Sequence, residues 1–93
     1  MKNISYDQAI NILQRNKVVL LDVQLESDYN KKHIVGSINI PVEEINKKAL
    51  QIIKDKNQTI IVYCLKGIRS EAASDMLKRL GYKNIYNIQG GID

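Results

Sequence analysis

The sequence predicts an α/β fold, a small parallel β-sheet flanked by helices, because apolar runs typical of buried strands alternate with segments of helical periodicity. Two runs carry the prediction: residues 18–23 and 59–63 are continuous and rich in branched side chains. Strands buried on both faces of a parallel sheet have this composition. The helical segments between and after them supply the crossovers that parallel strands require.

The first half of the chain contains one predicted helix and two predicted strands. Ser5 and Gln8 have the spacing of a capping box, so a helix should begin after Ser5. The strand at 18–23 follows, and residues 37–40 form a shorter strand that ends at Pro41. The apolar residues of the first helix fall on one face: Tyr6, Ala9, Ile10 and Leu13.

The second half continues the alternation. A helical stripe after Pro41 predicts a second helix, residues 54–58 form a polar loop, and the strand at 59–63 is the strongest in the chain. A helix that Gly81 ends and a short strand at 84–88 complete the domain. The stripes consist of Val42, Ile45, Ala49, Ile52 and Ile53, and of Ala73, Met76, Leu77 and Leu80.

Length and composition exclude several classes of protein. Residues 1–93 suffice for a single domain, and no run approaches the roughly 20 apolar residues that cross a bilayer. The first five residues lack a secretory signal, so we expect a cytoplasmic protein that binds no membrane. The charge of +4 comes mostly from lysine without a basic–aromatic motif, so we expect no nucleic-acid partner.

One cysteine and one histidine, Cys64 and His33, exclude an internal disulfide and leave too few ligands for a structural metal. Cys64 directly follows the strand at 59–63 and precedes a predicted helix, which is where open α/β sheets bind ligands. Free backbone N–H groups and the positive end of the helix favour a thiolate there. Gly67 allows the loop to curl, and Arg69 offers donors to an anion. The alternative is a buried core cysteine beside a solvated arginine.

The motif Cys64-x-x-Gly67-x-Arg69-Ser70 resembles the active-site loop of rhodanese domains. Three further segments resemble the family's patterns in the same order, across nearly the whole chain. They are Leu-Asp-Val at 21–23 with Asp-Tyr at 28–29, His-Ile-Val-Gly-Ser-Ile-Asn-Ile-Pro at 33–41, and Gly-Tyr at 81–82 with Gly-Gly at 90–91.

The resemblance implies a sulfurtransferase. Cys64 would accept a sulfane sulfur from a donor such as thiosulfate and pass it from the persulfide to a thiol or cyanide, or to a protein acceptor. Arg69 would steady the donor's charge, and Ser70 would also cap the helix. No cofactor is implied, and we expect a monomer. The residues expected to offer backbone N–H groups to the persulfide are Leu65, Lys66, Gly67, Ile68 and Ser70.

Two other functions remain open. Cysteine-dependent phosphatases and arsenate reductases have one residue more between cysteine and arginine than the four found here, so this tighter loop suits a sulfur atom better than a phosphate. A rhodanese-like module that binds a protein partner without turnover is the second alternative. The intact Cys64 and Arg69 favour an enzyme over it.

Residues around the loop carry further expectations. Asp22 ends a neighbouring strand, and we expect its carboxylate either to bond Arg69 or the loop backbone or to cap its own strand end. His33 should be structural, and Lys66 should either attract anionic donors or be one more solvated lysine. Two departures from the family pattern are Gln24, where arginine is common, and the lack of the usual tryptophan-bearing tail after residues 90–91.

Overall fold

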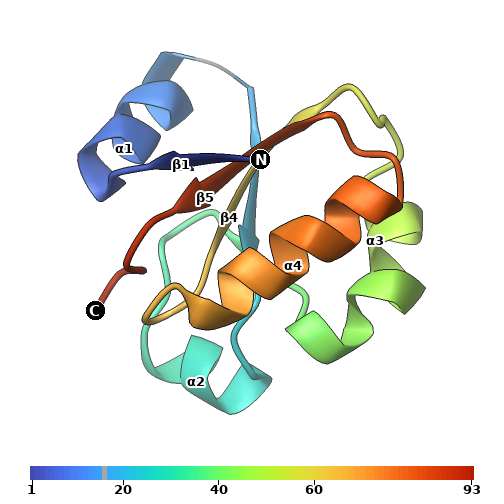
Figure 1. The fold of residues 1–93 in the computed structure, drawn as a ribbon. Helices are drawn as coiled ribbons and strands as arrows, with labels where there is room; N and C mark the ends of the chain where they lie inside the picture. Colours follow the sequence, from blue (N-terminus) through green and yellow to red (C-terminus); the bar gives the residue numbers. More distant parts are fainter. Residues whose placement is uncertain (16) are drawn as a thin grey trace.

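The computed structural model describes residues 1–15 and 17–93. Its centre is a five-stranded sheet with the order β1-β5-β4-β2-β3, and all neighbouring strands are parallel (Figure 1). This confirms the predicted α/β class, with β4 at the centre of the sheet. The strands are β1 (Lys2–Ile4), β2 (Val19–Asp22), β3 (Ile38–Asn39), β4 (Thr59–Tyr63) and β5 (Asn84–Ile88).

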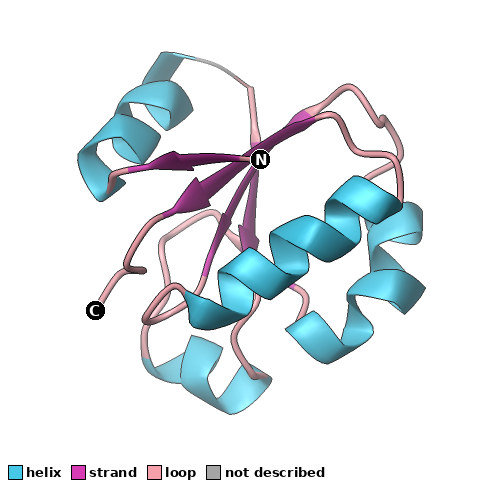
Figure 2. Cartoon of the chain, viewed as in Figure 1, coloured by secondary structure: helices cyan, strands magenta, loops and turns pink. Residues whose placement is uncertain are grey.

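Helices connect the strands, as Figure 2 shows. The predicted capping box is present: the Gln8 amide donates to Ser5 Oγ at 3.1 Å, and the Ser5 amide donates to Gln8 Oε1 at 2.8 Å. The helix predicted after Pro41 begins with a short 3₁₀ turn before it becomes an α-helix. The helical elements are α1 (Tyr6–Arg15), α2 (Glu26–Lys31), η1 (Val42–Glu44), α3 (Ile45–Ile52) and α4 (Ile68–Arg79).

The sheet separates two apolar clusters because successive strand residues point to opposite faces. Along β4, Ile60 and Val62 pack on the side of α3 and α4, whereas Ile61 and Tyr63 pack on the side of α1. Cys64 continues the first set and belongs to the cluster beneath α3 and α4. The fold is therefore a three-layer α/β/α arrangement (Figure 1).

Two observed elements lack a counterpart among the predicted ones. Strand β1 has three residues at the sheet edge, of which only Ile4 is buried. Helix α2 buries none of its residues, so its sequence has no apolar stripe. Both elements depend on neighbours: β1 pairs with β5, and α2 lies below the end of β2 (Figure 1).

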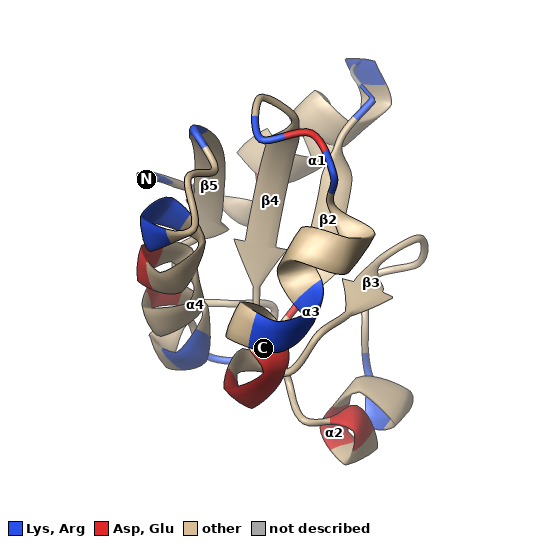
Figure 3. Ribbon diagram, turned by 90° about the vertical axis from the view of Figure 1, so that its right-hand side faces the viewer, with Lys and Arg blue, Asp and Glu red and all other residues tan. Residues whose placement is uncertain are grey.

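Charged side chains lie mainly on helices and loops, and the central strand β4 carries none (Figure 3). Among the described helices, none is long and apolar enough to cross a bilayer. Within residues 1–15 and 17–93, no cluster of three or more His, Cys, Asp or Glu residues could hold a metal ion.

Candidate active site

Cys64 lies at the carboxyl end of β4, as the sequence predicted, and its residue surface is 2% exposed. The Gly67 amide donates to Cys64 Sγ at 3.0 Å, and the thiol lies 3.6 Å from Ser70 Oγ. A backbone donor of this kind stabilises a sulfur anion, and Ser70 Oγ accepts from the thiol. The sulfur is thus held in a polar niche although its residue belongs to the apolar core.

Gly67 makes the curl of the loop possible. Its φ of 93° lies in the left-handed region, and a Cβ on it would lie 2.9 Å from the Gly90 backbone nitrogen. Gly67 is also the N-cap of α4, so the prediction that Ser70 caps this helix is wrong. Ser70 lies in the first turn, where its hydroxyl donates to the Gly67 carbonyl at 3.1 Å. The helix begins earlier than predicted because glycine supplies the turn.

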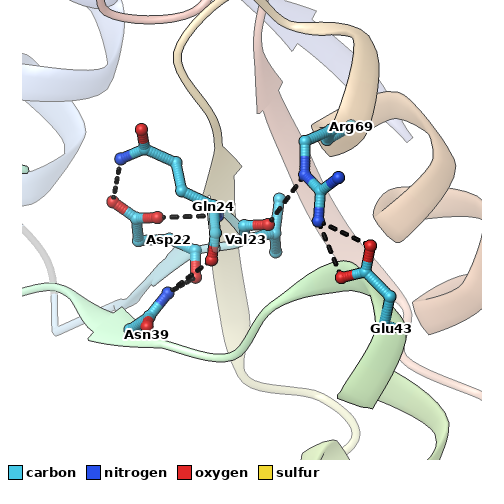
Figure 4. A network of polar contacts seen from close by, with 6 residues as sticks. All are labelled: Asp22, Val23, Gln24, Asn39, Glu43 and Arg69. Atoms are coloured by element: carbon cyan, nitrogen blue, oxygen red, sulfur yellow. Dashed lines mark hydrogen bonds and ion pairs between the residues drawn. The ribbon is translucent and has the colours of Figure 1, made fainter. Parts of the chain in front are cut away.

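Arg69 also lies in the first turn of α4 and is tied to two other segments (Figure 4). Its Nη2 donates to both carboxylate oxygens of Glu43 at 2.7 and 2.9 Å, and its Nε donates to the Val23 carbonyl at 3.4 Å. The hydrogen bond from Arg69 lowers the pKa of Glu43, which is therefore an anion at neutral pH. No sequence pattern indicated this ion pair.

A cavity of about 340 Å³ opens beside Cys64. It brings together Cys64, Arg69, three of the five residues predicted to bind the persulfide, and two residues that follow β2; Gly67 and Ser70 are not among its lining residues. The lining residues are Gln24, Asp28, Cys64, Leu65, Lys66, Ile68 and Arg69. Of the backbone N–H groups expected at the sulfur, Gly67 has a direct hydrogen bond to it.

Residues 5–93 match the model of the rhodanese-like domain. The chain belongs to this family. Among solved structures, a rhodanese-related protein from Thermoplasma volcanium has the same fold, with a TM-score of 0.86 and 30% identity. That similarity covers 100% of this rhodanese-like chain and 88% of the other.

Two curated relatives show how the domain is used elsewhere. The thiosulfate sulfurtransferase PspE of Escherichia coli is 36% identical over 75% of this chain and 67% of its own length. A tRNA uridine(34) hydroxylase of Buchnera aphidicola is 37% identical over 96% of this rhodanese-like chain. The chain spans only 30% of the hydroxylase's length.

Asp22 does not bond Arg69 or the Cys64 loop; its carboxylate accepts from Gln24 instead, through the backbone amide and Nε2, both at 2.9 Å (Figure 4). The first alternative for Asp22 is therefore wrong and the strand-end cap is correct. Asp22 is fully buried. Burial, followed by the Asp22 carboxylate, raises the pKa of Tyr63, which stays neutral.

Gln24 connects two segments of this rhodanese-like chain through hydrogen bonds of its buried side chain. Besides Asp22, its Nε2 donates to the Lys32 carbonyl at 3.0 Å, and its residue is 3% exposed. A buried amide therefore joins the end of β2 to the segment after α2. The sequence showed that Gln24 replaces the charged arginine common in the family, but it did not predict the hydrogen bonds of Gln24 to Asp22 and Lys32.

The segment with the double glycine at 90–91 packs against the backbone of the Cys64 loop. The Ile92 amide donates to the Leu65 carbonyl at 3.0 Å and to the Cys64 carbonyl at 3.2 Å. A Cβ on Gly91 would collide with the Leu65 carbonyl. The motif resemblance marked these glycines, but only the structure shows that they touch the loop.

His33 lies apart from the sulfur niche. Its ring stacks on Tyr29 with centroids 3.9 Å apart, and Nδ1 lies 2.7 Å from the Tyr29 carbonyl. Together with Tyr6 and residues 91–93, His33 lines a separate cavity of about 650 Å³. Cys64 does not line this cavity. These contacts agree with the structural role expected for His33.

Proposed function

We propose that the protein is a sulfurtransferase in which Cys64 carries sulfur as a persulfide. The observation that supports this best is the position of Sγ, 3.0 Å from the Gly67 amide and facing a cavity of about 340 Å³. A donor in this cavity meets a nucleophile already oriented by the backbone.

The proposed reaction has two displacements. The Cys64 thiolate attacks the outer sulfur of thiosulfate; a new S–S bond forms, the old one breaks, and sulfite leaves with its electron pair. Cyanide or a thiolate then attacks the outer sulfur of the persulfide, and Sγ leaves as the thiolate. The product is thiocyanate or a new persulfide, and no external oxidant or reductant is consumed.

The niche around Sγ supplies what both displacements require. The Gly67 amide stabilises negative charge on Sγ before attack and again when Sγ is the leaving group. Ser70 Oγ, 3.6 Å away, accepts from the thiol and donates to the Gly67 carbonyl, and after deprotonation of Cys64 its proton can turn from that carbonyl to the thiolate. Arg69 and Lys66 line the cavity and are proposed to hold an anionic donor.

Thiosulfate is the proposed donor because relatives such as PspE are thiosulfate sulfurtransferases. The short loop also supports sulfur over phosphate: four residues separate Cys64 from Arg69, and the Arg69 Nη2 is already held by Glu43. We therefore expect negligible hydrolysis of a small phosphate ester such as p-nitrophenyl phosphate.

The test is the mass of the intact protein after incubation with thiosulfate. Because Cys64 is the sole cysteine, a gain of one sulfur atom that cyanide removes assigns the persulfide to it. Cys64→Ser should gain no labile sulfur. If the wild-type chain gains none from any sulfane-sulfur donor, the sulfurtransferase proposal fails and the non-catalytic binding module replaces it.

A further inference from the structure

We propose that Glu43 tunes the donor specificity of the Cys64 site: by holding Arg69 it weakens the attraction for the thiosulfate dianion and thereby favours organic donors with one charge or none relative to it. Alkyl and aryl thiosulfonates and organic polysulfides belong to this favoured class. The inference rests on the proposed sulfur transfer at Cys64 and specifies its substrate class.

The charges around the cavity nearly balance. Lys66 and Arg69 line it as cations and Asp28 lines it as an anion. Glu43 adds a second anion, since both of its oxygens bond the Arg69 Nη2. A thiosulfate dianion therefore meets two cations and one anion in the cavity, and Glu43, outside the lining, offsets the charge of Arg69. Without Glu43 the two cations would attract the dianion more strongly.

The contacts that position Arg69 have a defined geometry, but the ion pair among them is exposed to solvent. Two of the three guanidinium nitrogens are engaged, Nη2 by Glu43 and Nε by the Val23 carbonyl, and Nη1 has no hydrogen bond to any described residue. The ion pair is exposed, with 38% of the Arg69 side chain and 60% of the Glu43 side chain accessible. Exposed ion pairs are weak, so Glu43 tunes the local charge without closing the site.

Apolar groups complete the cavity. Leu65 and Ile68 line it, and Ile68 is 76% exposed although it is a large apolar residue. An organic group on the donor would cover this side chain, which a small inorganic dianion cannot do. With a thiosulfonate, Sγ attacks the outer sulfur, the S–S bond breaks, and the sulfinate leaves with the electron pair.

The first experiment separates charge selection from catalysis. Iodoacetate and iodoacetamide alkylate the same thiol with reagents of similar size but different charge, so the ratio of their rates reports the field at Sγ. Glu43→Gln should raise the iodoacetate-to-iodoacetamide ratio by roughly three- to tenfold, as expected for one nearby surface charge. Glu44→Gln is the matched control, because it changes the net charge by the same amount and also breaks an ion pair, that with Lys48, but outside the cavity.

A double variant tests the route through Arg69. Arg69→Gln should lower the ratio because it leaves Glu43 uncompensated, and Glu43→Gln with Arg69→Gln should return it towards the wild-type value. If Glu43→Gln merely loosened the loop, both alkylation rates would change together. An unchanged ratio, or one that Glu44→Gln reproduces, overturns the inference.

The second experiment uses donors. The ratio of kcat/KM for thiosulfate to that for benzenethiosulfonate should rise at least threefold in Glu43→Gln, by the same electrostatic argument. Transfer without this change of ratio overturns the role of Glu43 and leaves the sulfurtransferase proposal intact. Absence of transfer from both donors overturns the donor specificity together with the sulfurtransferase proposal, even where the alkylation ratio responds.

Discussion

The site has an inner and an outer part that are built on different principles. The inner part holds Sγ with the Gly67 amide and the Ser70 hydroxyl, and all three of these residues are buried. The outer part consists of Arg69 and Glu43, whose ion pair is largely open to solvent. Buried hydrogen bonds to the backbone are costly to break, whereas exposed ion pairs contribute little. We therefore expect the inner part to determine whether the proposed sulfur transfer occurs and the outer part to determine with which donor.

Gly91→Ala should have the largest effect, because it disrupts the packing of residue 91 against the backbone of the Cys64 loop. A left-handed φ costs alanine about 1–2 kcal/mol, and the collision of its Cβ with the Leu65 carbonyl adds about 1–3 kcal/mol. Chemical denaturation should show both losses in the free energy of unfolding. Gly90→Ala is the matched control, with a φ of 80° but open space around its Cβ. It should show only the loss that comes from the left-handed φ. Equal losses in the two variants would contradict the proposed role of this packing.

Ser70→Ala sharpens the description of the inner part. Ser70 Oγ accepts from the thiol and donates to the Gly67 carbonyl, so it becomes a donor to the thiolate when its proton turns from that carbonyl. Removing the hydroxyl deletes this donor, so alkylation of Cys64 by iodoacetamide at neutral pH should slow by roughly tenfold, as for a hydrogen bond to a charged group. Ser74→Ala is the control: its buried hydroxyl bonds the Ser70 carbonyl and not the sulfur. Similar slowing in both variants would mean that loss of helix packing, not loss of the donor, is responsible.

Arg69→Ala tests the outer part and should have the smallest effect of the three. It leaves Glu43 uncompensated beside the cavity, so the apparent KM for thiosulfate should rise roughly three- to tenfold. Arg69→Lys should recover only part, because lysine keeps the charge but loses the planar geometry. Lys66→Ala, which removes the other cation of the cavity, an exposed residue, should raise the KM less. Steady-state kinetics that show no change in Arg69→Ala would remove this residue from donor binding.

The sequence alone determined the α/β class and the place of the nucleophile. Continuous apolar runs specify buried strands such as β4, and a cysteine directly after such a strand must lie at the carboxyl edge of the sheet. The capping box of α1 was equally predictable, because Ser5 and Gln8 are local partners. The order of four motifs also indicated the family that the comparison of residues 5–93 shows.

The tertiary structure alone decided the elements and contacts that depend on distant segments. Strand β1 and helix α2 bury too little apolar surface to leave a periodic pattern. Arg69 pairs with Glu43, which comes from a distant segment of the chain, because long-range side-chain partners depend on distance and burial in the folded protein and not on spacing along the chain. The contact of Gly91 with the Cys64 loop likewise joins residues that only folding brings together.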